Sequence, residues 1–290
     1  MKDSHKRLLK QMAEMAEEGK LGQSIKATRE EYAQLPVGIA TMLKCVRDAY
    51  EEKPGITEEM RQTRDMFCQL IIVAYRDAAH VNQEVALALA HSFISDYPGV
   101  AESCLAPQAC SLVQAGLALR ELTDSTNRLL VWQQMSHLVL AYNEFLNALL
   151  GFMIPCIRCS HGKPPDANVF SAPYRSKIEQ LNSLTGGEAG AFYLITRLAR
   201  PTIRNAIAHR TIWLDAEAAK VRFTDGRKDR KECEIDLVEF GMLGLLGSHL
   251  GEPYLAAIGT IAVMEDGTEL AKALLPQHLV RVFSFRKEET

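Results

Sequence analysis

The chain has 290 residues, of which 47% are hydrophobic and 24% are charged, a composition typical of a soluble globular protein with one large or two ordinary domains. Its net charge of −3 excludes a globally basic nucleic-acid-binding protein, so a polyanion site would depend on a local group of cations. Uncharged apolar runs stay shorter than the roughly 18–20 residues of a membrane helix, and the charged, amphipathic start is unlike a secretory leader. Because the seven cysteines are an odd number, we expect free thiols in a cytoplasmic protein without a membrane segment.

Residues 1–121 predict an N-terminal helical domain that carries no group of catalytic type. Apolar side chains recur at helical spacing, and prolines and glycines mark breaks between the segments. The expected helices cover residues 4–19, 37–52, 58–80 and 82–95, and an apolar stretch with a break at Pro107 covers 100–119. Thr57 is the expected N-cap of the third of these helices.

Residues 122–290 predict a second helical domain, so the expected fold class is mostly α in two helical parts. The cluster Leu122–Ser125 offers several helix N-caps in a row and marks the boundary. A long apolar helix at about 125–153 should be central in this domain. Prolines and glycines predict a loop insertion at 154–173, and alternating apolar residues predict a β-hairpin at 211–237. Further helices are expected at 174–184, 188–199, 202–209, 237–250, 254–264 and 269–281.

The predicted loop contains Cys156, Cys159 and His161, which have a spacing compatible with zinc ligands. No second pair of ligands at zinc-finger spacing follows, so a structural site would need a distant fourth ligand. We expect free thiols and no metal here. A zinc-stabilised adaptor is the alternative that metal analysis would decide.

Residues 201–209 predict a short helix that groups polar side chains on one arc. If Arg204 defines 0°, Asn205 lies at about 100° and His209 at about 140° on a helical wheel. Isoleucines fill the opposite arc, and the small Ala208 leaves room for a ligand between the arginine and the histidine. A cation, an amide and an imidazole are therefore expected to face the same region.

These three side chains suit the cleavage of a phosphodiester without a metal or another cofactor. Histidine exchanges a proton near neutral pH. Arginine binds phosphate oxygens in a forked geometry and stabilises developing negative charge, and asparagine orients a hydroxyl or a phosphate oxygen. A ribose 2′-OH could then attack its own 3′-phosphate. The simpler interpretation is a helix C-terminus whose Arg and His contact the last carbonyls.

The run Ala199–His209, A-R-P-T-I-R-N-A-I-A-H, resembles the signature of the HEPN superfamily (higher eukaryotes and prokaryotes nucleotide-binding domain), an Arg followed after four to six residues by a His. The resemblance covers about residues 123–240. Members are all-helical, and many are metal-independent endoribonucleases of toxin–antitoxin and phage-defence systems that work as dimers with a composite site. The resemblance implies a HEPN-like helical bundle in which Arg204, Asn205 and His209 are catalytic. It also implies RNA, a second copy of the chain and an antitoxin or regulatory protein as partners.

One departure concerns the residue two places after the histidine. A toxin subgroup paired with nucleotidyltransferase antitoxins has a tyrosine there, whereas this chain has Thr211. We therefore predict no tyrosine modification at this position.

Cations gather around the motif, with ten Lys and Arg against five Asp and Glu between Arg197 and Glu232. This local excess favours a polyanion, and a charged, solvated hairpin tip is the alternative interpretation. The expected RNA-binding residues are Arg200, Arg210, Arg222, Arg227 and Lys228.

Two hypotheses of function follow. The favoured one is a metal-independent endoribonuclease, with Glu144 of the long helix as a candidate to orient Arg204. The alternative is a non-catalytic helical component that binds RNA or protein in a larger complex. Exposure of Arg204 and His209 to solvent would favour the enzyme, whereas a buried His209 would favour the binding protein.

Overall fold

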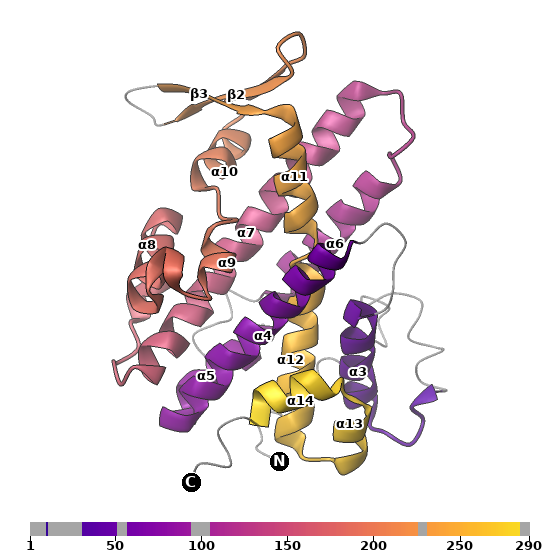
Figure 1. Cartoon of the computed structure of the whole chain (residues 1–290), viewed down its shortest axis with the longest axis vertical. Coiled ribbons are helices and arrows are strands. Elements are labelled where there is room, and N and C mark those ends of the chain that lie inside the picture. Colours follow the sequence, from indigo (N-terminus) through magenta and orange to yellow (C-terminus); the bar gives the residue numbers. More distant parts are fainter. Residues whose placement is uncertain (1–9, 11–30, 51–56, 94–104, 226–230, 285–290) are drawn as a thin grey trace. The chain divides into compact units, whose positions relative to one another are not determined.

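The computed structural model describes residues 31–50, 57–93, 105–225 and 231–284, together with Lys10. This part of the chain is mostly helical and contains a small three-stranded antiparallel sheet, which confirms the mostly α fold class (Figure 1). The predicted helix at 4–19, apart from Lys10, and the predicted RNA-binding residues Arg227 and Lys228 lie outside the described residues.

The chain divides into two compact units, each formed by segments that are separated in the sequence. The first unit comprises residues 1–106, 152–170 and 252–290, and the second unit comprises residues 107–151 and 171–251. This division differs from the predicted boundary between residues 121 and 122. The reason is that α6 (Ala106–Arg120) packs against α11 (Leu237–Ser248), where a Cβ on Gly116 would lie 3.3 Å from the Cβ of Ser248.

Every regular element among the described residues of the first unit is a helix. Its elements are α3 (Val37–Tyr50), α4 (Glu58–Val81), α5 (Gln83–Ala90), the 3₁₀ helices η1 (His91–Phe93) and η3 (Ala167–Val169), α12 (Gly251–Asp266), α13 (Glu269–Leu274), α14 (Gln277–Ser284) and the end of α7 (Arg128–Ser160). Thr57 caps α4 as predicted, because its hydroxyl accepts the backbone N–H of Met60 at 3.3 Å. The single helix predicted at 269–281 is wrong, since Pro276 cannot donate a helical hydrogen bond and separates α13 from α14.

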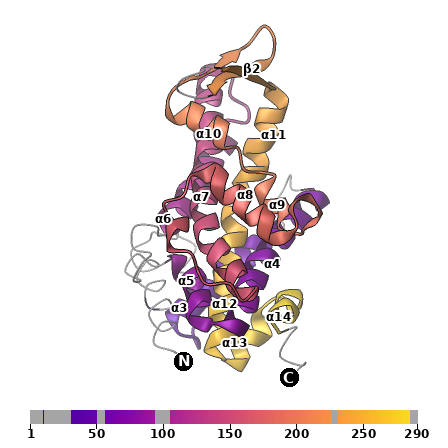
Figure 2. The same cartoon turned by 90° about the vertical axis from the view of Figure 1, so that its left-hand side faces the viewer.

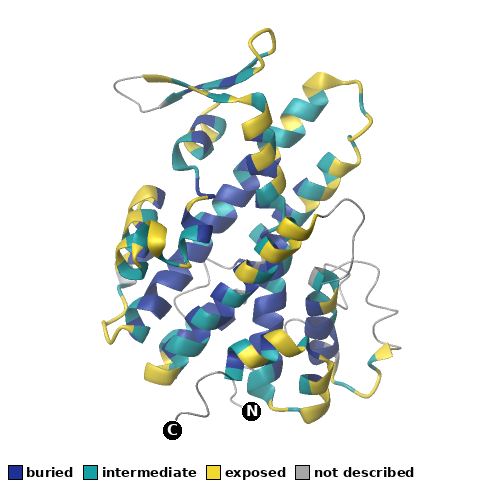
Figure 3. Cartoon of the chain, in the orientation of Figure 1, coloured by how far each residue is buried: buried dark blue, intermediate teal, exposed yellow. Residues whose placement is uncertain are grey.

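The core of the first unit lies around α12, which Figure 3 shows as buried along most of its length. Gly259 brings α12 close to α3, because a Cβ there would lie 2.9 Å from the carbonyl oxygen of Met42. The buried hydroxyls of Ser92 and Tyr254 share a hydrogen bond of 2.9 Å, so the polar atoms of this core are also partly paired.

The second unit combines helices with the sheet. Its elements are α6, the first part of α7, α8 (Tyr174–Thr185), η4 (Gly187–Ala189), α9 (Tyr193–Thr196), α10 (Pro201–Ala208), β1 (Ile212–Asp215), β2 (Lys220–Asp225), β3 (Lys231–Asp236) and α11. Gly247 lets α11 lie directly on α7, because a Cβ there would lie 2.2 Å from the ring of Tyr142. The helix predicted at 188–199 is wrong except for the short α9. Gly186 adopts a left-handed φ of 84° and ends α8, and a short 3₁₀ turn follows it.

The region predicted as a hairpin is a three-strand meander in the order β1-β2-β3. The register pairs Trp213 with Arg222 and Arg222 with Glu234, so these three side chains share one face of the sheet. The opposite face carries the buried Val221 and Phe223, which pack toward α10 and α11. Figure 2 shows β2 next to α10 and the start of α11. The predicted β structure is thus confirmed in type and extended by one strand.

Helix α7 continues through Pro155 to Ser160, so the loop insertion predicted at 154–173 is wrong in its first seven residues. Proline removes one helical N–H and leaves the carbonyl of Gly151, four residues earlier, without that partner. Buried side chains on both sides of Pro155 offset this loss. By length and composition α7 also qualifies as a membrane-spanning helix, but 78% of its most apolar window is buried inside the protein, as in the core helix of a soluble protein.

Candidate functional site

The motif helix α10 begins as the sequence predicts, with Pro201 in its first turn. Arg200 precedes it as the N-cap residue, and the backbone N–H of Arg200 donates to Oδ1 of Asn143 on α7 at 2.8 Å. The side chains of Ile203 and Ala206 are buried on the inner side of the helix. The start of α10 is therefore held by a side chain of the long helix rather than by a cap of its own.

Asn143 was not predicted from the sequence as part of the site. It is fully buried, and its Nδ2 donates to the carbonyl of Val139 at 2.8 Å. Besides the N–H of Arg200, its Oδ1 accepts the hydroxyl of Tyr174 at 3.2 Å, which brings α8 into the same network. The available signal was an amide inside a broadly apolar helix, because a buried polar side chain requires partners.

Glu144 contacts the motif arginine as the sequence suggested. Its Oε1 accepts Nε–H of Arg204 at 2.8 Å and lies 2.7 Å from Nη2, while Nη1 of Arg204 donates to Oδ1 of Asn205 at 3.0 Å. The side chains of Arg204 and Glu144 are 29% and 38% exposed, so the pair lies at the surface without being fully solvated. These contacts fix the plane of the guanidinium and engage three of its five N–H donors, which leaves two for a ligand.

His209 is the C-cap residue of α10 and its side chain is exposed. Its backbone N–H donates to the carbonyl of Asn205 at 2.9 Å, and its imidazole makes no hydrogen bond to any residue that the structure describes. The structure therefore places Arg204, Asn205 and His209 on one short helix, with the imidazole open to solvent. A His209 buried in the fold, the condition that would favour the binding protein, is not observed.

The C-terminus of α10 forms a Schellman motif with an arginine in the position that usually holds glycine. The N–H of Thr211 donates to the carbonyl of Ala206 at 2.8 Å, and the N–H of Arg210 donates to that of Ile207 at 3.1 Å. Arg210 has a left-handed φ of 58°. An L residue with a side chain pays about 1–2 kcal/mol for this conformation, so the backbone directly after His209 is strained.

Replacing Arg210 by Gly is expected to raise the free energy of unfolding by about 0.5–1 kcal/mol, because glycine adopts the left-handed conformation without steric cost. Chemical denaturation measures this change. The control is Ala208→Gly, which changes a right-handed helical position and should lower the free energy of unfolding by about 0.5–1 kcal/mol. Equal losses in both variants would contradict the left-handed conformation of Arg210.

The predicted RNA-binding cations differ in how far their side chains already pair with other groups of the protein. Arg210 is exposed, whereas Arg222 forms ion pairs with Asp215 at 3.0 Å and Glu232 at 3.1 Å across the sheet. The guanidinium of Arg200 donates to backbone carbonyls of the preceding turn. On the outer face of the sheet, the side chain of Arg222 therefore pairs with carboxylates of the neighbouring strands. The local excess of cations counted in the sequence overstates the positive charge available to RNA there.

A cavity of about 270 Å³ opens at the N-terminal end of α10. Its lining residues come from α10, the sheet and the start of α11: Arg200, Pro201, Thr202, Ile203, Phe223, Glu234, Ile235 and Glu239. None of the three motif residues lines it. Its two glutamates outnumber its single arginine, which makes this cavity a poor site for a phosphate.

The two cysteines of the sequence-proposed zinc motif lie buried on α7, and their sulfurs contact backbone carbonyls of Val85 and Ala78. Burial raises the pKa of both thiols, which disfavours the thiolate that binds zinc. His161 lies past the end of the helix and is exposed. Within the described ranges no group of three or more His, Cys, Asp and Glu side chains could hold a metal ion.

Comparisons with protein-family models, with curated proteins and with solved structures found no match to this chain. Fold and site together define a mostly helical protein with an oriented arginine and an exposed histidine at the end of one short helix.

Proposed function

We propose that the protein is a metal-independent endoribonuclease of the HEPN type. The observation that carries the proposal is the pairing of Arg204 with Glu144 on a helix whose other end presents an exposed His209. The ion pair orients the guanidinium, and the imidazole makes no hydrogen bond to the described residues, so both groups remain available to a substrate.

In the proposed reaction His209 acts as the general base. Its imidazole removes the proton of a ribose 2′-OH, and the 2′ oxygen attacks the adjacent phosphorus. The bond from phosphorus to the 5′ oxygen of the next nucleotide breaks, and that oxygen leaves with a proton from water or from a second imidazole. The products are a 2′,3′-cyclic phosphate and a 5′-hydroxyl end.

Arg204 stabilises the charge that develops on the phosphate oxygens in this reaction. Its two remaining N–H donors suit a forked contact with a phosphate. Because Glu144 fixes the guanidinium before the substrate binds, little reorganisation is needed when the charge develops. Asn205 accepts a hydrogen bond from Arg204, and its amide nitrogen remains available to orient the ribose or the phosphate.

We further propose that two copies of the chain bring their motif helices together in a composite site. Such a dimer would supply the second imidazole and double the positive charge facing one RNA backbone. A cytoplasmic toxin or phage-defence enzyme of this kind would need an antitoxin or a regulatory protein to limit its activity.

The purified protein is expected to cleave single-stranded RNA in the presence of EDTA and to leave 2′,3′-cyclic phosphate ends. Gel analysis of a labelled RNA, with a 2′-deoxy substitution at the cleaved position as control, measures this. Binding of RNA without cleavage would favour the non-catalytic binding protein, and cleavage that survives the 2′-deoxy substitution would exclude attack by the 2′ oxygen.

A further inference from the structure

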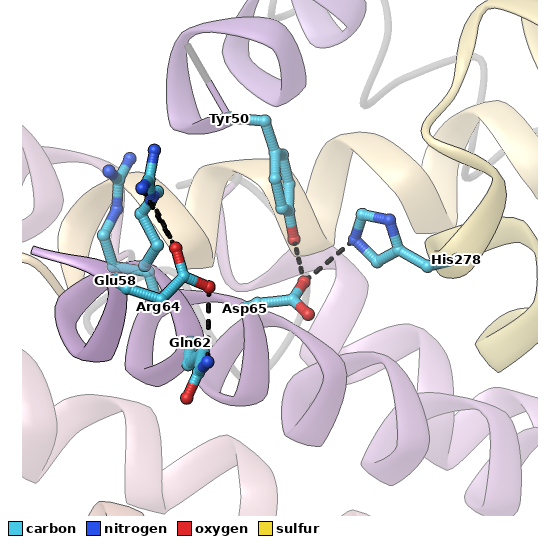
Figure 4. A pocket seen from close by; sticks show the side chains of 7 residues that line it. Tyr50, Glu58, Gln62, Arg64, Asp65 and His278 are labelled. Carbon is cyan, nitrogen blue, oxygen red and sulfur yellow. Dashed lines mark hydrogen bonds and ion pairs between the residues drawn. The ribbon is translucent and has the colours of Figure 1, made fainter. Parts of the chain in front are cut away.

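A polar cavity of about 220 Å³ lies in the first unit, far in sequence from the motif. It is lined by residues from the end of α3, the first turns of α4 and the start of α14: Tyr50, Glu58, Arg61, Gln62, Arg64, Asp65 and His278 (Figure 4). Two guanidinium groups and an imidazole, which are side chains that bind phosphate groups in proteins, share this cavity with the carboxylates of Glu58 and Asp65 and outnumber them.

Asp65 fixes the side chains that line the His278 side of this cavity. Its Oδ1 accepts the hydroxyl of Tyr50 at 2.8 Å and lies 2.9 Å from Nε2 of His278, and its Oδ2 accepts the amide of Gln69 at 2.8 Å. The rings of Tyr50 and His278 also meet edge to face, with centroids 5.1 Å apart. The imidazole plane is therefore fixed, and Figure 4 shows its second ring nitrogen turned away from Asp65.

The two arginines of the cavity differ in how firmly they are held. Arg64 is only 5% exposed and pairs with Glu252 at 2.8 Å, so its charge is a permanent part of the wall. Arg61 pairs with Glu58 at 3.0 Å, and these side chains are 46% and 62% exposed. Exposed pairs of this kind contribute only about 0–1 kcal/mol, so an incoming phosphate can compete with Glu58 for the guanidinium of Arg61.

A second cavity of about 300 Å³ shares Tyr50 with the first. Its lining is mainly apolar and aromatic, and comprises Tyr32, Leu43, Val46, Arg47, Tyr50, Leu274 and Pro276. A cavity with this lining suits a flat aromatic ring, because tyrosine rings and prolines supply contact area without unpaired polar groups. The side chain of Tyr50 thus lines both a polar cavity that suits an anion and an apolar cavity that suits a ring.

We propose that these two cavities form one binding site for a nucleoside monophosphate. The phosphate contacts Arg61, and Arg64 adds fixed positive charge. The base occupies the apolar cavity beside Tyr50. This site lies entirely within the first unit and does not depend on the ribonuclease activity proposed for the second.

Isothermal titration calorimetry with the full-length protein tests the site, using the four ribonucleoside 5′-monophosphates, adenosine and inorganic phosphate as probes. At least one monophosphate is expected to bind with a sub-millimolar Kd. Adenosine and inorganic phosphate should each bind about tenfold or more weakly than the preferred monophosphate, since each fills only one cavity. Absence of measurable binding by all four monophosphates would overturn the proposal.

Two variants with opposite expected effects on the Kd make the test specific. Arg61→Ala should weaken binding about tenfold or more, whereas Glu58→Gln should strengthen it several-fold, because the competing carboxylate is removed. Arg281→Ala removes an exposed cation from the same helix as His278 and should leave the Kd unchanged. Binding that depends on Arg204 instead of Arg61, or that Glu58→Gln weakens, would place the nucleotide elsewhere.

Discussion

Replacing His209 by Ala is expected to lower the rate of RNA cleavage by about 10²–10⁴-fold, the usual contribution of a positioned general base. The free energy of unfolding should change by less than about 0.5 kcal/mol, because the imidazole is exposed and makes no hydrogen bond to the described residues. Single-turnover cleavage in EDTA and chemical denaturation measure the two quantities. A large loss of rate without a loss of stability separates a catalytic role from a structural one.

His161→Ala is the matched control, since this histidine is also exposed but lies after α7, outside the site. Its rate should equal that of the unchanged protein. A His209→Ala variant that cleaves at the unchanged rate would remove this residue from the mechanism. If only RNA affinity fell, His209 would be a binding residue.

Replacing Arg204 by Lys is expected to lower the rate by about 10²–10³-fold, although the charge is retained. An ammonium group cannot donate to Glu144 and Asn205 and also present two parallel donors to a phosphate. RNA affinity should change less than the rate, because the lost contacts matter most when charge develops in the transition state. Measurements of rate and affinity on the same RNA distinguish these effects.

Glu144→Gln tests the orienting role separately, and a smaller loss of rate, about tenfold, is expected. Combining it with Arg204→Lys should cost little more than Arg204→Lys alone, because Glu144 acts through the guanidinium. Arg120→Lys, at the exposed end of α6, is the control for an arginine outside the site. Additive losses in the double variant would show that Glu144 acts independently of Arg204.

The sequence predicted the motif helix and its polar arc because both depend on local chemistry. Pro201 in the first turn and isoleucine on one side define the helix and its buried side without reference to the rest of the chain. Glu144 and Arg204 lie 60 positions apart in the sequence. Because local patterns do not show which distant residues meet, their contact could only be stated as a hypothesis. Asn143 was missed for the same reason, since its partners lie on other elements.

The sequence-based predictions that differ from the structure share one physical cause. Pro155 was interpreted as the end of a helix, but burial on both sides of it outweighs one missing hydrogen bond. Arg222 was counted as a free cation because its partners Asp215 and Glu232 lie on neighbouring strands. Local patterns indicate an element's type, whereas its extent and its charge balance are decided by residues distant in the sequence.

Asn143 and Glu144 are adjacent on α7, and each holds a different part of α10. One residue holds the start of α10 and its neighbour holds Arg204. A one-residue insertion between them would turn one relative to the other by about 100° and shift it by about 1.5 Å. Related chains that keep this geometry should therefore tolerate no insertion or deletion between residues 143 and 144.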